Sequence, residues 1–412
     1  MIKSIRRLGW SDAHLADIAL PGGVMRLTRS LASGLARCAG DPPGTFWGVG
    51  DRGPNIKPDD AADRYGLEHL RPLGAHDGAK IMPLPGAGPA LARFRRDGDA
   101  ISLEAATPLH SASGKPIGGL PVPHGPHAEF EPIYGLDGAA LPTGPDGADS
   151  EGIAAQADGS FWISEEYGPS LLRVSPDGTV RERWVPEGLT ESFAGASYPV
   201  RALLPALAAA RKLNRGFEAI AVSDDGAVIT LAFQSPLAHP DRAAHEASTL
   251  LRIWQLDGAS GALLAEYAYP LDPPESFRRD ADLGEVVNAD IKVSELLLLG
   301  GGDVLVLERV TKSTKLYRVR LDPAHALPAA LSQLETRPTL EQLGAANWAT
   351  AGVIPLAKTL VFDTDQHPEI PGDLEGMVLL APDELLLSND SDFGIEGAET
   401  EFWLVKFAQP LA

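Results

Sequence analysis

The stretch that decides the fold is EGIAAQADGSFWISEEYGPSLLRVSPDG, residues 151–178. It contains three short apolar runs, separated by an Asp-Gly turn and a polar corner and closed by a second Asp-Gly turn, which is the pattern of consecutive antiparallel strands. The opening glutamate recurs, because GFEAIA (216–221) and DLEGMV (373–378) place a glutamate before the same kind of apolar run. Such self-similarity predicts a repeat architecture.

Further units of this kind begin elsewhere in the chain, and adjacent units start roughly 65 to 80 residues apart. They cover residues 218–236 with a third strand delayed to 249–258, residues 295–322, residues 375–407, and a divergent unit at 33–55 with later strands at 90–105. Short β-rich repeats with few helices are typical of propeller blades. We therefore predict an all-β fold, a β-propeller of five or six blades. A β-sandwich whose hairpins are similar by accident is the alternative.

The repeats predict a single propeller domain over residues 1–412, with insertions near 57–89, 113–148 and 199–216. The last insertion, rich in Ala and Leu, is predicted to form the one short helix. Ring closure requires the first and last segments to share a sheet. We expect SIRRLGW (4–10) to pair with EFWLVKF (401–407), which removes a free strand edge.

Composition excludes several classes of partner. The net charge is −21, so we expect neither a nucleic acid nor an anionic membrane surface to be bound. No segment has the length and apolarity of a membrane span. Cys38 is the only cysteine, which rules out an intramolecular disulfide. With no visible signal peptide, the default location is cytoplasmic, or periplasmic or secreted if a signal was removed; the oligomeric state is left open.

The repeated glutamates occupy equivalent places in the blades. In an antiparallel pair, the residue that opens the first strand lies beside the residues that follow the second. Because the first strands of blades line the central channel, the units are expected to aim a ring of carboxylates at one channel mouth. The residues predicted at this mouth are Asp51, Arg52, Glu151, Glu165, Glu166, Glu218, Glu295, Glu308, Arg309, Glu375, Asn389 and Asp390. Asn55, Tyr167, Gln234 and Asp392 are expected beside them, and Ser33 stands where the other units have the glutamate.

Several carboxylates in a small space cannot all ionise without a large cost unless a cation is present. Oxygen ligands of this kind suit Ca²⁺ or another hard ion. The predicted metal ligands are Asp51, Glu151, Glu218, Glu308, Glu375, Asn389 and Asp390. The alternative is that each glutamate only accepts hydrogen bonds from the next blade's backbone. Two weaker candidates are DTDQHPE (363–369) and the pair His124 and His127.

Taken together, GVGDRGPN (48–55), residues 149–178, NRGFEAIAVSDDG (214–226), VLVLERV (304–310) and residues 374–394 resemble the phytase-like family, often described as "esterase-like activity of phytase". The resemblance runs from about residue 30 to residue 407. It implies a β-propeller and hydrolysis of phosphoesters or other esters, with the mouth residues above at the matching positions. One departure is Ala219, where the other motifs have glycine after the glutamate.

If the resemblance holds for activity, the protein is a metal-dependent hydrolase of small-molecule phosphoesters or other esters, with Ca²⁺ as the expected metal. Glu165 or Glu166 would help to deprotonate the attacking water, and Arg52 and Arg309 would hold anionic oxygens of the substrate. Each arginine could instead form only a salt bridge with neighbouring acids. A lactonase-like propeller hydrolase would share the same metal geometry. The alternative of a different class is a non-catalytic propeller that binds a ligand or partner at this mouth, with calcium purely structural.

Overall fold

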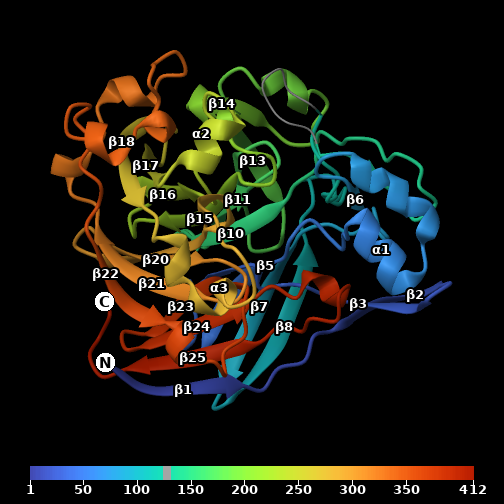
Figure 1. The fold of residues 1–412 in the computed structure, drawn as a ribbon. Coiled ribbons are helices and arrows are strands. Elements are labelled where there is room, and N and C mark those ends of the chain that lie inside the picture. Colours follow the sequence, from blue (N-terminus) through green and yellow to red (C-terminus); the bar gives the residue numbers. More distant parts are fainter. Residues whose placement is uncertain (124–130) are drawn as a thin grey trace.

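Five sheets form the blades of a propeller in the computed structural model, which describes residues 1–123 and 131–412. The innermost strands β4, β10, β15, β19 and β23 contact one another in this cyclic order, and β23 contacts β4, so the ring is closed (Figure 1). The prediction of five or six blades is therefore confirmed, with five.

From the innermost strand outward, the blades are β4 (Gly34–Ala36), β5 (Thr45–Val49), β7 (Ala90–Asp97), β8 (Ala100–Pro108); β10 (Ser150–Ala155), β11 (Phe161–Glu165), β12 (Ser170–Val174), β13 (Val180–Pro186), β14 (Val200–Leu204); β15 (Phe217–Val222), β16 (Val228–Phe233), β17 (Leu250–Asp257), β18 (Leu263–Pro270); β19 (Lys292–Gly300), β20 (Asp303–Arg309), β21 (Thr314–Arg320), β22 (Lys358–Asp363); and β23 (Leu374–Ala381), β24 (Glu384–Asn389), β25 (Phe402–Phe407), β1 (Ile2–Leu8).

The N-terminal strand closes the ring as the sequence predicts. Strand β1 pairs antiparallel with β25, with Ile5 opposite Val405 and Leu8 opposite Phe402. In Figure 1 the blue β1 runs beside the red β25, although the two are at opposite ends of the chain. This pairing joins the chain ends within one blade, where the ladder of hydrogen bonds holds them together.

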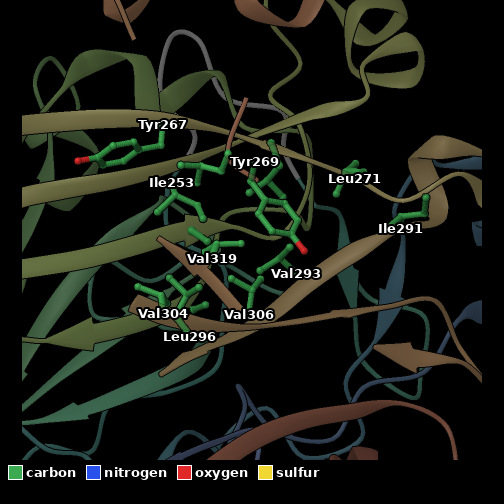
Figure 2. Packing of buried hydrophobic residues seen from close by; sticks show 14 of the residues in the cluster. Ile253, Tyr267, Tyr269, Leu271, Ile291, Val293, Leu296, Val304, Val306 and Val319 are labelled. Carbon is green, nitrogen blue, oxygen red and sulfur yellow. The ribbon is translucent and has the colours of Figure 1, made fainter. Parts of the chain in front are cut away.

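The hydrophobic core is divided among the interfaces between neighbouring blades. One cluster lies between the blade of β15–β18 and the blade of β19–β22, and Figure 2 shows Ile253 and Tyr269 of the first packed against Val293, Val306 and Val319 of the second. Four similar clusters fill the other four interfaces. Because each blade buries both faces against its neighbours, the innermost strands are held in fixed positions around the channel.

Serine hydroxyls join neighbouring innermost strands. Ser164 Oγ accepts a hydrogen bond from Gly152 N at 2.9 Å and donates one to Glu218 O of the next blade at 2.9 Å. Ser388 Oγ donates to Ala32 O at 2.8 Å in the same way. The close approach explains the glycine that follows the repeated glutamate, because a Cβ at Gly152 would lie 2.6 Å from Glu218 O.

Substituting Gly152 by alanine is therefore expected to destabilise the protein by about 1–3 kcal/mol through overpacking of this contact. The measurement is urea unfolding followed by tryptophan fluorescence. Gly40→Ala is the matched control, since a Cβ at Gly40 would meet no heavy atom within 4 Å. A Gly152→Ala variant as stable as the control would contradict the close packing of the innermost strands.

The insertion 199–216 contains a short helix as predicted, but it is a 3-10 helix that covers only part of the segment. This segment contains β14, which pairs parallel with β13 as a fifth strand of its blade, and a short 3-10 helix, η3 (Ala206–Ala210). Pro205 stands between them and disfavours helical geometry in the residue before it. Burial of Leu204 and Leu207 against the blade decides the structure over helical propensity.

A small module lies beside the propeller and consists of the β2–β3 hairpin (His14–Leu20 and Gly23–Thr28), helix α1 (Pro58–Tyr65) and the parallel pair of β6 (Lys80–Ile81) and β9 (Ile133–Tyr134) (Figure 1, right). It has its own apolar cluster around Met25, Ile56 and Leu70. Two further α-helices in the described residues are short, α2 (Arg242–Ala247) and α3 (Arg278–Ala281). None of the helices in residues 1–123 and 131–412 combines the length and apolarity required to cross a bilayer.

Candidate functional site at the channel mouth

A polar cavity of about 340 Å³ opens where the innermost strands begin. Its walls carry ten acidic side chains and five basic ones, so the charge of the lining is strongly negative. The charged lining residues are Asp51, Arg52, Lys57, Lys80, Asp149, Glu151, Glu166, Glu218, Lys292, Arg309, Asp373, Glu375, Asp390, Asp392 and Glu396. The cavity therefore gathers side chains from all five blades and from the side module. Ser33, which takes the place of the repeated glutamate in the blade of β4, is not among the lining residues.

Bulges in the ladder aim the repeated glutamates into the cavity. In β15, Phe217 pairs with Phe233 and Ala219 with Ala232, so Glu218 is the extra residue. Glu375 is skipped in the same way between Leu374 and Gly376, and the ladder of β10 shifts next to Glu151. A bulged residue leaves the regular alternation and points its side chain in a new direction.

The third unit follows a different register. Its extra residue is Ser294, because Val293 pairs with Glu308 and Glu295 with Leu307. Glu295 is thus one position further along, where its carboxylate accepts hydrogen bonds from Leu35 N at 3.5 Å and Leu296 N at 3.0 Å. For this glutamate, the structure shows a carboxylate bound to backbone amides, of its own strand and of β4, rather than delivery to the mouth.

Two groups of three carboxylates at the mouth are close enough to hold a cation. One group is Asp51, Asp149 and Glu151, and the other is Asp51, Asp390 and Asp392; in each, ligand oxygens lie within 4.8 Å of one another. Asp149 is 1% exposed, and neither of its oxygens accepts a hydrogen bond in the described part of the chain. Glu218 Oε2 is likewise buried without a hydrogen-bond partner there.

Buried acids at the mouth hold their protons tightly. Burial, followed by the nearby charge of Glu218, raises the pKa of Glu166 to about 8. Burial also raises the pKa of Asp51, Glu151 and Glu375 well above the usual range, and for Asp51 the neighbouring Asp149 adds to the effect. A group of this kind favours either a proton or a bound cation at neutral pH.

These shifts predict how the stability of the metal-free protein depends on pH. Because the pKa of Glu166 is near 4.5 in the unfolded chain and about 8 in the folded one, the unfolded state loses its proton first as pH rises. Stability should therefore fall between about pH 4.5 and 8, by up to about 1.4 kcal/mol per pH unit for each carboxyl that stays protonated. Thermal unfolding in EDTA across this range measures the decline, and a flat profile would contradict the raised pKa values.

Both predicted arginines lie at the mouth, and both are ion-paired. Arg52 Nη1 lies 2.8 Å from Glu131 Oε1 and 2.9 Å from Asp149 Oδ2. Arg309 pairs with Glu375 and, at 2.7 Å, with Asp373, and it donates to Ser294 Oγ at 2.9 Å. The two guanidinium groups therefore flank the acidic centre while being partly neutralised by it.

Besides Glu295, the predicted site residues Glu165, Glu308 and Asn389 lie outside the cavity lining, where their side chains serve the fold. Glu165 forms a fully buried ion pair with Arg183 at 2.7 Å. Glu308 accepts hydrogen bonds from Tyr269 at 2.5 Å and Lys358 at 2.7 Å. The Asn389 amide donates to Asp390 O and Glu399 O at 3.0 Å each. The period of two along a strand explains this, since neighbours of mouth residues point to the opposite face.

Two lysines at the mouth were not predicted from the sequence. Neither Lys80 nor Lys292 makes an ion pair or side-chain hydrogen bond with the residues that the structure describes. The charge of Arg309, followed by burial, lowers the pKa of Lys292 to about 8, and burial together with Arg52 lowers that of Lys80. Lys292 is the first residue of β19, so the rule that the opening residues of the innermost strands lie at the mouth could have predicted it. Lys80 comes from the side module, where the sequence contains no repeat that would have pointed to the mouth.

Backbone strain is concentrated at the same place. The four non-glycine residues with positive φ in the described ranges are Asn214, Asp373, Asp392 and Phe393. Three of them line the cavity, and Phe393 directly follows Asp392. Asn and Asp tolerate this conformation better than other residues, and such strain is common at functional sites.

The weaker sequence candidates do not gather at the mouth. Asp363 and Asp365 of residues 363–369 accept hydrogen bonds within their own turn and from Ser313 and Arg278, and neither lines the cavity. His124 and His127 lie outside the described residues.

Fold and site together define the class: a five-bladed β-propeller with a deep, predominantly acidic site at one end of its channel. The chain matches the phytase-like family, described as "Esterase-like activity of phytase", over residues 31–393, and it belongs to that family. The resemblance read from the sequence motifs is thereby confirmed.

The individual proteins that resemble this chain share little sequence identity with it. A protein of Arthroderma benhamiae described as "Uncharacterized secreted protein" is 26% identical over 295 residues, which are 65% of this chain and 54% of that protein. The chain thus spans about half the length of this curated relative. Aldose sugar dehydrogenase from Streptomyces coelicolor aligns with a TM-score of 0.35 at 10% identity over 98% of this chain and 97% of that one. Virginiamycin B lyase from Staphylococcus aureus aligns with a TM-score of 0.34 at 10% identity over 98% of each chain. At these scores the two structures carry no weight for function.

Proposed function

We propose that the protein is a metal-dependent hydrolase of small anionic esters, phosphoesters foremost, acting in the cavity at the channel mouth. The observation that carries this proposal is the joint presence of buried carboxylates without hydrogen-bond partners and of lysines without ion pairs. A site that only held a structural cation would need the first but not the second. A cation and an anionic substrate together would satisfy both sets of groups.

The donor set suits a hard divalent ion such as Ca²⁺, because it consists of carboxylate oxygens. Asp51, Asp149 and Glu151 would hold the cation, with Glu218 close to Glu151. When bound, it would supply positive charge that neutralises the substrate and polarises the scissile group. Glu375 contributes less to this set because its carboxylate is paired with Arg309.

The chain's own residues have distinct roles in this proposal. Lys80 and Lys292 bind anionic oxygens of the substrate, because their ammonium groups are free to donate, and Arg52 and Arg309 add positive charge on the same two sides. Glu166, whose pKa is about 8, exchanges a proton with the attacking water or the leaving group at Oε1 or Oε2. The surrounding blades keep these groups in fixed positions.

The experiment that tests this function starts from protein stripped with EDTA. Addition of Ca²⁺ should restore turnover of p-nitrophenyl phosphate by at least about a hundredfold, with p-nitrophenyl acetate slower, because only the phosphoester can use the lysines. The control is Mg²⁺ at equal concentration. If Ca²⁺ restores thermal stability but no ester is hydrolysed, the protein is instead a ligand-binding propeller with structural calcium, the second candidate function.

A further variant addresses the cation directly. Glu151→Gln is expected to lower Ca²⁺ retention on gel filtration by at least about tenfold, since it removes a carboxylate with no protein partner in the described residues. Glu375→Gln should have a smaller effect, because that carboxylate already pairs with Arg309. Equal retention in both variants and the wild type would place the cation elsewhere.

The secreted relative supports a location outside the cytoplasm for this chain as well. Immunoblotting of cell fractions distinguishes this location from the cytoplasm.

A further inference from the structure

We propose that the mouth holds two divalent cations side by side, with Asp51 as their shared ligand. This inference deepens the proposed function and rests on its cation. It assigns Asp149 and Glu151 to the first position and Asp390 and Asp392 to the second. The two sets of three carboxylates share only Asp51. Within each set, the ligand oxygens lie within 4.8 Å of one another.

The first position is supported by the state of Asp149. Its side chain is buried, and neither Oδ1 nor Oδ2 accepts a hydrogen bond from the described residues. Arg52 Nη1 lies 2.9 Å from Oδ2, and Oδ1 has no hydrogen-bond partner in the described residues. A buried carboxylate oxygen in this state is costly unless a ligand completes its environment.

The second position is supported by the way in which its ligands are held. Ser33 Oγ donates to Asp390 Oδ2 at 2.7 Å, and Ser30 Oγ and Asp392 N donate to Asp390 Oδ1. Hydrogen bonds of this kind orient the carboxylates that bind metals. Asp392 follows with a φ of 47°, a left-handed conformation that brings its carboxylate to Asp51. Ser33, which replaces the repeated glutamate in its blade, thus acts by orienting a ligand from the preceding blade.

Charge balance favours two cations over one. The two groups together contain five carboxylates, and Arg52 is the cationic side chain that contacts them in the described part of the chain. Two divalent cations would neutralise the excess of negative charge, whereas one would leave half of it. Two cations bridged by a carboxylate are a recurrent arrangement in enzymes that cleave phosphoesters.

The test is calorimetric titration of EDTA-treated full-length protein with Ca²⁺ alone. The wild type should bind two Ca²⁺ per chain, and Asp149→Asn and Asp392→Asn should each bind one. Asp51→Asn should weaken both binding events by at least about tenfold, which is the signature of a shared ligand. Asp373→Asn is the matched control, because Asp373 lines the same cavity but pairs with Arg309 and belongs to neither group; it should keep two.

The outcomes separate the two proposals. A single Ca²⁺ in the wild type, or loss of only one event in Asp51→Asn, would overturn the shared site, and circular dichroism of each variant excludes misfolding as the cause. The wild-type stoichiometry decides even if a variant does not fold. Two bound Ca²⁺ without turnover of any ester would keep the cation pair and refute the hydrolase, whereas turnover with one bound Ca²⁺ would do the reverse.

Discussion

Replacing Glu166 by glutamine should lower kcat/KM for p-nitrophenyl phosphate by about 10²–10⁴-fold while leaving the fold intact. The side chain lines the mouth and carries a pKa of about 8, which suits proton exchange near neutral pH. Glutamine has the same shape and can still accept a hydrogen bond from Gly216 N, which lies 3.3 Å from Oε1 in the wild type. The measurement is steady-state kinetics in saturating Ca²⁺.

The control for this variant is Glu191→Gln, an exposed glutamate outside the cavity lining, whose activity should match the wild type. If Glu166→Gln retained full activity with unchanged Ca²⁺ binding, proton transfer would have to be assigned to another group at the mouth. A loss of Ca²⁺ binding in parallel with activity would instead make Glu166 a ligand rather than a proton carrier.

Replacing the preceding residue, Glu165, should instead lower the stability of the fold and leave the affinity for Ca²⁺ unchanged. Glu165→Gln is expected to reduce the free energy of unfolding by about 3–5 kcal/mol, because it leaves the Arg183 guanidinium buried without a counter-charge. Both side chains are 0% exposed, and Glu165 also accepts hydrogen bonds from Tyr167 N at 2.8 Å and Ser170 Oγ at 2.7 Å. Urea unfolding at pH 7 in EDTA measures the loss.

The double variant Glu165→Gln/Arg183→Met checks the cause. Removing both charges should recover part of the lost stability, since an uncompensated buried charge costs more than an absent pair. A single variant as stable as the wild type would contradict the buried pair. A folded Glu165→Gln protein should keep its affinity for Ca²⁺, in contrast to the Glu151→Gln variant.

The contrast between Glu165 and Glu166 shows how far sequence reasoning reaches. The antiparallel pairing of the first and second strands correctly predicts that the end of β11 lies at the mouth, but it predicts both glutamates there equally. Successive side chains of a strand point to opposite faces, so only one of two neighbours can reach the cavity. Which one does so depends on the register of β11 in its sheet, and the apolar pattern does not show this register.

Glu308 and Arg309 repeat the same situation at the end of β20. Arg309 reaches the mouth, whereas Glu308 turns to Lys358 of its own blade and to Tyr269 of the neighbouring blade. The sequence predicts which residues precede and follow a strand. The face of the sheet on which each of them lies is known only once the register of the strand is known.

The sequence by itself determined the repeated β-unit, the propeller, the ring closure by the N-terminal strand and the acidic character of the mouth. These features follow from local patterns: apolar runs of strand length, Asp-Gly turns and a carboxylate at a fixed place in each unit. Only the tertiary structure decided the rest, namely the register that withdraws Glu295, the lysines delivered by β19 and the side module, and the meeting of Asp149 with Asp390 at Asp51. Those relations join residues far apart in the chain, and they arise from how whole blades pack around the axis, which no short stretch of sequence encodes.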